Sequence, residues 1–275
     1  MSLTVGTAPF GTAPGGTWNR EMPEHKGLIY FEDFPRRVRA EFAGETVVDS
    51  RNAKLLHEHG LLPILYFPAD EVRTDLFVRS DKSTHCPWKG DASYWSIDVA
   101  GRTADDAVWE YREPLEGVPS IKGHFALYWS KMDRWLEEDE EMVVHVRDPY
   151  TRVDVLDSSR HVKVAVDGVV LADTKRAKAL FETGLPTRWY IPLEDVSLDA
   201  LTPSGGATAC AYKGYATTLS ARVNGEEVEG IAWTYRDPRR DAERVRGHVC
   251  FLNEHVDIEI DGRPQERPVT KFSRR

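Results

Sequence analysis

The chain of 275 residues contains two copies of one sequence. Val38–His124 aligns with Val162–His248 without a gap, and the identical residues cluster in short motifs rather than being scattered. Chance does not keep such motifs at one constant offset, so we expect a tandem duplication of one domain of roughly 100 residues, a common domain size. The expected organisation is a flexible N-terminal arm over 1–27, a first repeat domain over 28–135, an acidic linker over 136–151, a second repeat domain over 152–262 and a C-terminal tail over 263–275.

Each copy has the pattern of an α+β domain that is mainly antiparallel β. In the first copy a strand is predicted at Val38–Phe42, and a turn and a second strand follow it. Asp49 is a good N-cap, so a helix of about three turns is predicted from there to Gly60, and the second copy repeats it from Asp173 to Gly184. We expect two β-rich domains with one helix each, related by a pseudo-two-fold axis as in a homodimer. Such a pseudo-dimer within one chain would be a monomer.

The composition argues against several classes of protein. Lys and Arg number 36 against 45 Asp and Glu, so the net charge of −9 disfavours a nucleic-acid-binding protein, which needs a basic surface. Three cysteines without a Cys-x-x-Cys pair predict neither a disulfide scaffold nor a four-cysteine zinc site. The N-terminus lacks the pattern of a signal peptide, and the longest apolar stretch, Leu61–Phe67, is too short to span a bilayer. We therefore expect a soluble, cytoplasmic protein with no membrane or nucleic-acid partner.

The motif Cys-x-x-Lys-Gly occurs at the same place in both copies, as Cys86–Gly90 and Cys210–Gly214. One interpretation is chemical: the ammonium group of the lysine lowers the pKa of the thiol or, with the backbone, holds an anion. The other is structural: a small buried cysteine packs under a turn whose glycine adopts a positive φ. Solvent exposure gives no reason to keep a lysine in both copies, so both lysines are candidates for function.

A second motif, Trp-x-Tyr-Arg-x-Pro, occurs as Trp109–Pro114 and Trp233–Pro238. On a strand, the Trp and the Tyr of each motif lie on the same face. They form either part of the core or one wall of an aromatic ligand site. A Gly-His pair precedes the last strand of each copy, and its histidine is either an acid–base group or a hydrogen-bonded structural residue.

Metal and phosphate sites are not indicated. One Cys and one His per copy fall short of the three or four ligands that a metal needs at motif spacing. The sequence contains no Gly-rich phosphate loop, nucleophile elbow or zinc-binding helix motif. We therefore expect no metal site and no other cofactor.

Three segments carry a resemblance to a known family: Cys86–Trp95, Leu185–Pro192 and Trp233–Tyr235. They resemble domain of unknown function 427, which is common in bacteria and fungi and is sometimes labelled a nucleotidyltransferase domain. The resemblance covers nearly all of both copies, and it implies a bacterial type of protein. Because single-copy members are common, it also implies that each copy is a complete fold.

We expect one small-molecule site in each copy, between the helix and the sheet. The ligand would be a polar or anionic metabolite held by Lys and Arg between aromatic walls. In a transferase or hydrolase reaction the cysteine would be the nucleophile, the histidine would transfer protons and the lysine would stabilise an oxyanion. The catalytic candidates are Cys86, Lys89, His124, Cys210, Lys213 and His248. The ligand-binding candidates are Tyr66, Trp109, Tyr111, Glu182, Arg188, Tyr190, Trp233 and Tyr235.

Two other functions fit the sequence. In a non-catalytic ligand-binding or scaffolding protein, the repeated aromatic residues would simply be core. In a nucleotidyltransferase, which the family label suggests, binding of nucleoside triphosphate would depend on Mg²⁺. Fold and family do not choose among these functions, and the sequence leaves open which copy carries a working site.

Overall fold

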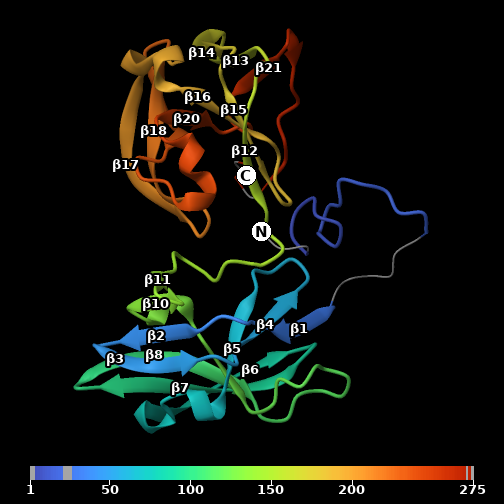
Figure 1. Ribbon diagram of the computed structural model, residues 1–275, viewed down its shortest axis with the longest axis vertical. Helices are drawn as coiled ribbons and strands as arrows, with labels where there is room; N and C mark the ends of the chain where they lie inside the picture. Colours follow the sequence, from blue (N-terminus) through green and yellow to red (C-terminus); the bar gives the residue numbers. More distant parts are fainter. Residues whose placement is uncertain (1–3, 21–26, 271, 274–275) are drawn as a thin grey trace. The chain divides into compact units, whose positions relative to one another are not determined.

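The computed structural model describes residues 4–20, 27–270 and 272–273. The expected flexible arm therefore lies partly outside the described residues. The chain forms two compact units, of which one extends to Asp148 and the other begins at Pro149. Figure 1 shows the first unit in blue to green and the second in yellow to red. Each unit is described by itself.

The first unit consists of two antiparallel sheets. The larger sheet has seven strands in the order β1-β4-β5-β9-β8-β7-β6, and the smaller has four in the order β11-β10-β2-β3. The seven strands, in spatial order, are β1 (Ile29–Asp33), β4 (Lys54–Glu58), β5 (Ile64–Pro68), β9 (His124–Leu127), β8 (Arg102–Tyr111), β7 (Gly90–Val99) and β6 (Phe77–Cys86). The four strands are β11 (Glu140–Glu141), β10 (Arg134–Glu137), β2 (Val38–Phe42) and β3 (Glu45–Ser50).

The second unit has the same two sheets with the same strand order. Its seven strands, in spatial order, are β12 (Val153–Asp157), β15 (Lys178–Glu182), β16 (Arg188–Pro192), β20 (His248–Phe251), β19 (Glu226–Thr234), β18 (Gly214–Val223) and β17 (Leu201–Cys210). Its four strands are β14 (Val169–Thr174), β13 (Val162–Val166), β21 (Asp257–Ile260) and β22 (Arg263–Pro264). The duplication and the mainly antiparallel β fold predicted from the sequence are therefore confirmed.

The predicted helix after Asp49 is wrong. The segment up to Gly60 completes β3 and forms β4, and the described residues contain only short 3-10 helices in place of α-helices. The pattern misled because β4 is buried on both faces, so that Leu55 and Leu56 are both apolar although they point to opposite sides of the sheet. The carboxylate of Asp49, which was expected to cap the helix, instead accepts two hydrogen bonds from the guanidinium of Arg37. In the second unit β15 likewise replaces the helix predicted up to Gly184.

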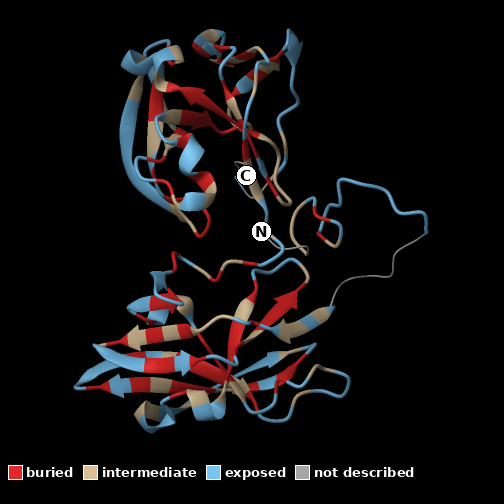
Figure 2. Cartoon of the chain, viewed as in Figure 1, coloured by how far each residue is buried: buried red, intermediate tan, exposed pale blue. Residues whose placement is uncertain are grey.

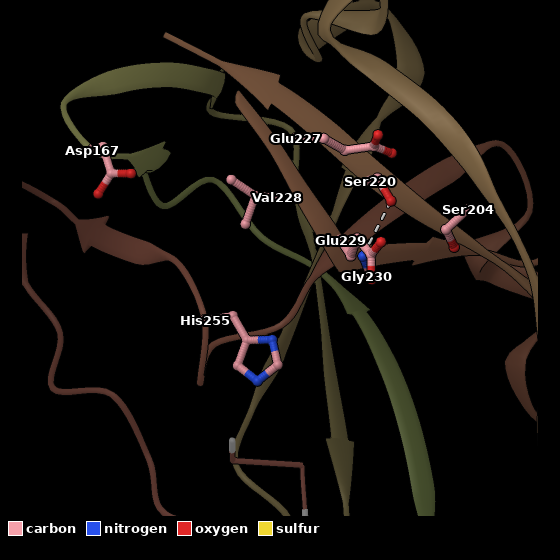
Figure 3. A pocket seen from close by; sticks show the side chains of 8 residues that line it. All are labelled: Asp167, Ser204, Ser220, Glu227, Val228, Glu229, Gly230 and His255. Carbon is pink, nitrogen blue, oxygen red and sulfur yellow. Dashed lines mark hydrogen bonds between the residues drawn. The ribbon is translucent and has the colours of Figure 1, made fainter. Parts of the chain in front are cut away.

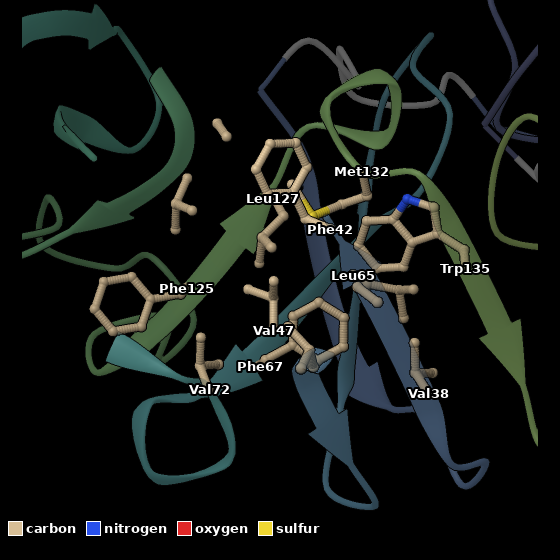
Figure 4. Close-up of a cluster of buried hydrophobic side chains, with 14 of the residues drawn as sticks. Val38, Phe42, Val47, Leu65, Phe67, Val72, Phe125, Leu127, Met132 and Trp135 are labelled. Carbon is tan, nitrogen blue, oxygen red and sulfur yellow. The ribbon is translucent and has the colours of Figure 1, made fainter. Parts of the chain in front are cut away.

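The seven-stranded sheet of the first unit buries both of its faces. One face packs against the four-stranded sheet in a core that includes Leu65, Phe67 and Val108, together with Trp135 of β10 (Figure 4). The opposite face carries a separate apolar cluster that includes Tyr66, which lies between Leu65 and Phe67 in the chain. This alternation follows from the two-residue period of a strand. In Figure 2 the buried residues follow the strands while most of the loops are exposed.

The acidic run Glu137–Glu141, which was expected to begin the linker, forms the β10–β11 hairpin of the four-stranded sheet. Glu137 is buried and accepts hydrogen bonds from Arg36 and from Arg147, the latter at 3.2 Å. The run therefore contributes to the first unit. Within the described part of the chain, no helix has the length and apolarity that crossing a membrane requires.

The edges of the larger sheets share one irregularity. One of the two edge strands of each sheet, β6 or β17, is ten residues long and largely exposed. The register of β6 on β7 shifts between Arg79 and Ser83, and that of β17 on β18 shifts between Pro203 and Ala207. Both edge strands are therefore bent in the middle rather than straight.

The core of the first unit makes a direct prediction. Phe67 is fully buried and stacks on Trp135 with a centroid distance of 6.2 Å. Replacing it in Phe67→Ala should lower the free energy of unfolding by about 3–5 kcal/mol, because the lost ring leaves a cavity. Urea titration monitored by tryptophan fluorescence measures the change. The control Val78→Ala removes an apolar side chain that is 54% exposed and should stay within about 0.5 kcal/mol of the wild type. Equal losses in both variants would contradict the two-sheet core.

Candidate functional site

The Cys-x-x-Lys-Gly motif forms the tight turn between β6 and β7. Cys86 is the last residue of β6 and pairs with Gly90, the first of β7, and the N–H of Lys89 donates to the Cys86 carbonyl at 3.3 Å. Gly90 has a φ of +98°, and a Cβ there would lie 3.4 Å from the carbonyl oxygen of Glu113. The motif therefore needs glycine for its backbone, as the structural interpretation proposed.

The turn directs its lysine into the protein rather than into solvent. Lys89 is buried, and its Nζ lies 2.5 Å from Oε2 of Glu58 at the end of β4. The same ammonium lies 5.6 Å from the centre of the Tyr111 ring. Removing two charges from water costs several kcal/mol per ion, so a buried pair is weak evidence for stability. The burial of this ion pair therefore points to a role in function rather than in stability.

Beside this pair lies a cavity of about 420 Å³, lined both by residues of the apolar cluster around Tyr66 and by residues of the core between the two sheets, such as Leu65 and Trp135. Five residues predicted for the first site are brought together in its wall. Its lining consists of Glu58, Leu61, Pro63, Ile64, Leu65, Tyr66, Cys86, Lys89, Tyr94, Trp109, Tyr111, Leu127, Tyr128, Trp129, Trp135, His145 and Val146. The repeated aromatic residues are thus both an apolar cluster and the wall of a cavity.

Aromatic contacts fix the shape of this wall. Tyr128 lies 4.6 Å from Trp109 and is stacked on Tyr94 at 6.5 Å, measured between ring centres. Tyr94 also shares a hydrogen bond of 2.9 Å with the hydroxyl of Thr84. Lys82 Nζ lies 4.6 Å from the centre of the Tyr94 ring. The rings therefore hold one another in place, which favours a preformed site.

The tyrosine hydroxyls of the wall are neutral at physiological pH. Burial is the main cause that raises the pKa of Tyr66 and of Tyr111 well above the ordinary value of 10.0. Burial and the neighbouring Tyr94 raise the pKa of Tyr128 to about 12. These groups can therefore donate or accept hydrogen bonds, but they do not supply an anion to the cavity.

The predicted acid–base histidine does not line the cavity. Nδ1 of His124 lies 3.2 Å from the carbonyl oxygen of Lys122, and its ring meets the edge of Phe31 at 5.6 Å. In the second unit, Nδ1 of His248 lies 2.8 Å from the carbonyl oxygen of Arg246. Burial lowers the pKa of His248 below its ordinary value of 6.5. Two other acid–base groups line the cavity: His145, whose Nδ1 lies 2.7 Å from the Val146 carbonyl oxygen, and Glu58, which the sequence analysis named only through its counterpart in the second copy.

The second unit repeats the buried ion pair. Lys213 pairs with Glu182, the counterparts of Lys89 and Glu58. Burial disfavours the charge on Lys213, but the Glu182 carboxylate, with smaller contributions from Cys210 and Tyr235, raises its pKa above the ordinary value of 10.5. The Lys213 side chain is therefore a charged ammonium at physiological pH.

The aromatic residues of the second copy also meet. Nε1 of Trp233 donates a hydrogen bond of 3.0 Å to the hydroxyl of Tyr190. Burial raises the pKa of Tyr190 and of Tyr235 above 10.0. The third cysteine of the chain, Cys250, is fully buried in the same region, and burial raises the pKa of its thiol to about 12. Cys250 is therefore an inert thiol, unlike the partly exposed Cys86 and Cys210.

The units differ at one decisive position. Arg188 in β16 has the strand register of Ile64 in β5. Its guanidinium is buried and donates two hydrogen bonds to the Glu254 carboxylate, at 2.6 and 2.7 Å. It also lies 5.7 Å from the centre of the Trp233 ring. Arg188 thus covers the ring equivalent to Trp109, which faces the cavity in the first unit.

A second hollow, of about 810 Å³, lies in the second unit and contains none of the predicted site residues (Figure 3). Its walls are mainly polar and include three carboxylates, and the Ser220 hydroxyl accepts a hydrogen bond of 3.3 Å from the Gly230 N–H. It is lined by Asp167, Ser204, Ser220, Glu227, Val228, Glu229, Gly230 and His255. Among the described residues, no cluster of three or more His, Cys, Asp or Glu has the geometry of a metal site.

The Arg188–Glu254 pair predicts a pH-dependent stability. Burial raises the pKa of Glu254, but hydrogen bonds from Arg188 and Thr270 more than compensate and lower it below 4.5. The stabilising contribution of the carboxylate is therefore present above pH 4.5 and is lost as the pH falls through the lower value of the folded state. Glu254→Gln should cost about 3–5 kcal/mol at neutral pH, because it leaves a buried guanidinium without its carboxylate.

Denaturant unfolding of the wild type and of Glu254→Gln, from neutral pH to well below pH 4.5, measures this effect. The difference between the two proteins should shrink at acid pH. The control Glu226→Gln changes an exposed carboxylate and should leave the free energy of unfolding nearly unchanged at every pH. A difference that stays constant as the pH falls would contradict the assignment of the pair.

Comparison with known proteins agrees with the duplicated architecture. No curated protein shows significant similarity to the chain. One family model, described as a Domain of unknown function (DUF427), matches residues 30–138 and again residues 154–262. Together the two matches cover most of the chain and coincide with the two units of the fold. The chain therefore belongs to the DUF427 family, and it carries two copies of that domain in tandem.

Proposed function

We propose that the first unit binds a small, mainly apolar organic molecule in the cavity beside Cys86. The observation that carries this proposal is the cavity itself, which combines aromatic walls with the buried Lys89–Glu58 pair at one side. Its volume of about 420 Å³ is within the usual range for ligand sites, roughly 300–1,000 Å³. A ring or an alkyl group would pack against the adjoining rings of Trp109 and Tyr128, and one polar group would face the ion pair.

The charge of the cavity favours a neutral ligand over the anionic metabolite expected from the sequence. Lys89 already has a carboxylate at 2.5 Å, so its positive charge is balanced. A second anion would compete with Glu58 and would have to lose its hydration in an apolar setting, which is costly. A carbonyl or amide group could instead accept a hydrogen bond from the ammonium without displacing Glu58.

The proposal assigns the site to the first unit. In the second unit the guanidinium of Arg188 lies against Trp233 and is held there by Glu254. Ile64, in the same register position of the first unit, lines the cavity. The sequence predicts one ligand site in each copy, whereas we propose a single ligand site, in the first unit.

A screen with neutral fragments tests the proposal. Benzamide, phenylacetamide and phenylacetone are suitable probes, and ligand-observed NMR with the full chain detects their binding. Ile64 and Ser130 occupy the positions that Arg188 and Glu254 occupy in the second copy. The double variant Ile64→Arg/Ser130→Glu therefore introduces the Arg188–Glu254 ion pair into the first unit. It should weaken binding at least about tenfold, because it places a paired guanidinium over Trp109. A tenfold loss corresponds to about 1.4 kcal/mol of binding free energy.

Leu62→Arg controls for the introduced guanidinium, since it places an arginine two residues away on an exposed side chain that does not line the cavity. It should bind the probes as the wild type does. Unchanged binding in Ile64→Arg/Ser130→Glu, or no binding of any probe to the wild type, would contradict the proposal and favour a scaffolding role.

A further inference from the structure

We propose that Cys86, Lys89 and Glu58 form an acyl-transfer centre that hydrolyses an amide or ester bound in this cavity. The inference rests on the proposed function, because the cavity must bind the acyl compound before the thiol can act on it. It goes further by naming a reaction, a substrate class and the role of each of the three side chains.

The fold brings these three residues to one wall. Cys86 and Lys89 are fixed relative to each other by the tight β6–β7 turn, with its hydrogen bond of 3.3 Å between their backbones. Glu58 comes from β4, which three strands separate from β7 in the sheet, and it reaches the same wall through its bond to Lys89. All three line the cavity, and Cys86 is partly exposed to it rather than sealed in the core. The nucleophile is therefore accessible where the ligand would lie.

Each side chain has the chemistry that one role needs. A cysteine attacks as its thiolate, and a nearby ammonium group favours that form. An ammonium in a poorly hydrated site also stabilises the oxyanion that develops when a carbonyl carbon is attacked. A carboxylate within the same wall can accept the thiol proton and return it later. Because His124 points elsewhere, Glu58 takes the role that the sequence analysis gave to the histidine.

The reaction can be written with all atoms balanced. The Cys86 sulfur forms a bond to the carbonyl carbon as its proton moves to Glu58, and the ammonium of Lys89 stabilises the oxyanion. The carbon–nitrogen or carbon–oxygen bond then breaks, and the leaving amine or alcohol takes the proton from Glu58. Water attacks the resulting thioester and gives a proton to Glu58, the carbon–sulfur bond breaks, and the thiol recovers that proton. The net change is hydrolysis of the acyl compound by one water molecule.

The walls indicate the kind of acyl group. Trp109 and Tyr128 present ring faces 4.6 Å apart between centres, and the lining as a whole is largely apolar. Arylacyl or medium alkyl amides and esters fit this setting better than charged acyl groups, because the ammonium of Lys89 is already paired with Glu58. The second unit is an internal comparison: it repeats the trio as Cys210, Lys213 and Glu182, but Arg188 covers the equivalent ring.

The wild-type chain provides the first test. Full-length protein is mixed with para-nitrophenyl phenylacetate, the release of para-nitrophenol is followed, and peptide mass mapping locates the acyl group. We expect a phenylacetyl thioester on Cys86 that forms at least about tenfold faster than on Cys210, followed by turnover beyond one equivalent. Acylation of lysines alone, equal rates at Cys86 and Cys210, or no release above that of a free thiol would overturn the inference.

Variants then separate the roles of the three residues. Glu58→Gln should slow the acylation of Cys86 by about 10²–10⁴-fold if it removes the general base. Lys89→Met should slow it by about 10²–10³-fold through loss of oxyanion stabilisation. Cys86→Ala should abolish thioester formation. Rates within twofold of the wild type in a folded Glu58→Gln protein would also overturn the inference.

One further measurement distinguishes this inference from the function on which it rests. Phenylacetone cannot acylate a thiol, and its binding to Cys86→Ala reports on the cavity alone. Binding of phenylacetone without acylation by the ester in the wild type would overturn the acyl-transfer centre and leave the proposed binding function standing. Loss of both would overturn both, and binding together with acylation of Cys86 supports both.

Discussion

The two-sided burial of the seven-stranded sheet is the constraint on which the rest of each unit depends. An antiparallel sheet commonly packs one face on a core and leaves the other to solvent. Here the inner face packs on the four-stranded sheet, and the outer face carries a second cluster built on tyrosine and tryptophan. A small domain gains additional buried apolar area in this way, and residues of both clusters contribute to the lining of the cavity.

The same constraint explains what could and could not be predicted from the sequence. The internal repeat was sufficient to predict the duplication, and alternating strands such as Val38–Phe42 were predicted correctly because one of their faces is exposed to solvent or to loops. Strand β4 was mistaken for a helix because Leu55 and Leu56 are apolar at successive positions, which a strand shows only when both faces are covered. No pattern within one strand reveals that its second face will be covered by another part of the chain.

The candidate site was predictable in part for a similar reason. Tyr66, Cys86, Lys89, Trp109 and Tyr111 were chosen because they recur in both copies, and the structure brings them to one wall. Tyr94 and Tyr128 escaped notice because they occur only in the first copy, where the second has Thr218 and Leu252. The ion pair itself was missed because Glu58 and Lys89 are distant in sequence and join across the sheet, although the match of Glu58 with Glu182 was available as a signal. The internal repeat thus identifies the site residues that the two copies share, whereas the site residues that occur in only one copy must be found in the structure.

The bent edge strands β6 and β17 reduce the tendency of the protein to aggregate at high concentration. A protein with two similar sheets displays two similar rows of unpaired backbone groups, and straight edges of that kind would pair with those of other molecules into fibres. The shifts after Arg79 in β6 and after Pro203 in β17 interrupt each row midway, and Pro203 removes a donor as well. Duplicating a β-rich domain doubles the number of edge strands that could pair with other molecules. Because both copies carry the register shift, each of the long edge strands β6 and β17 is also protected against such pairing.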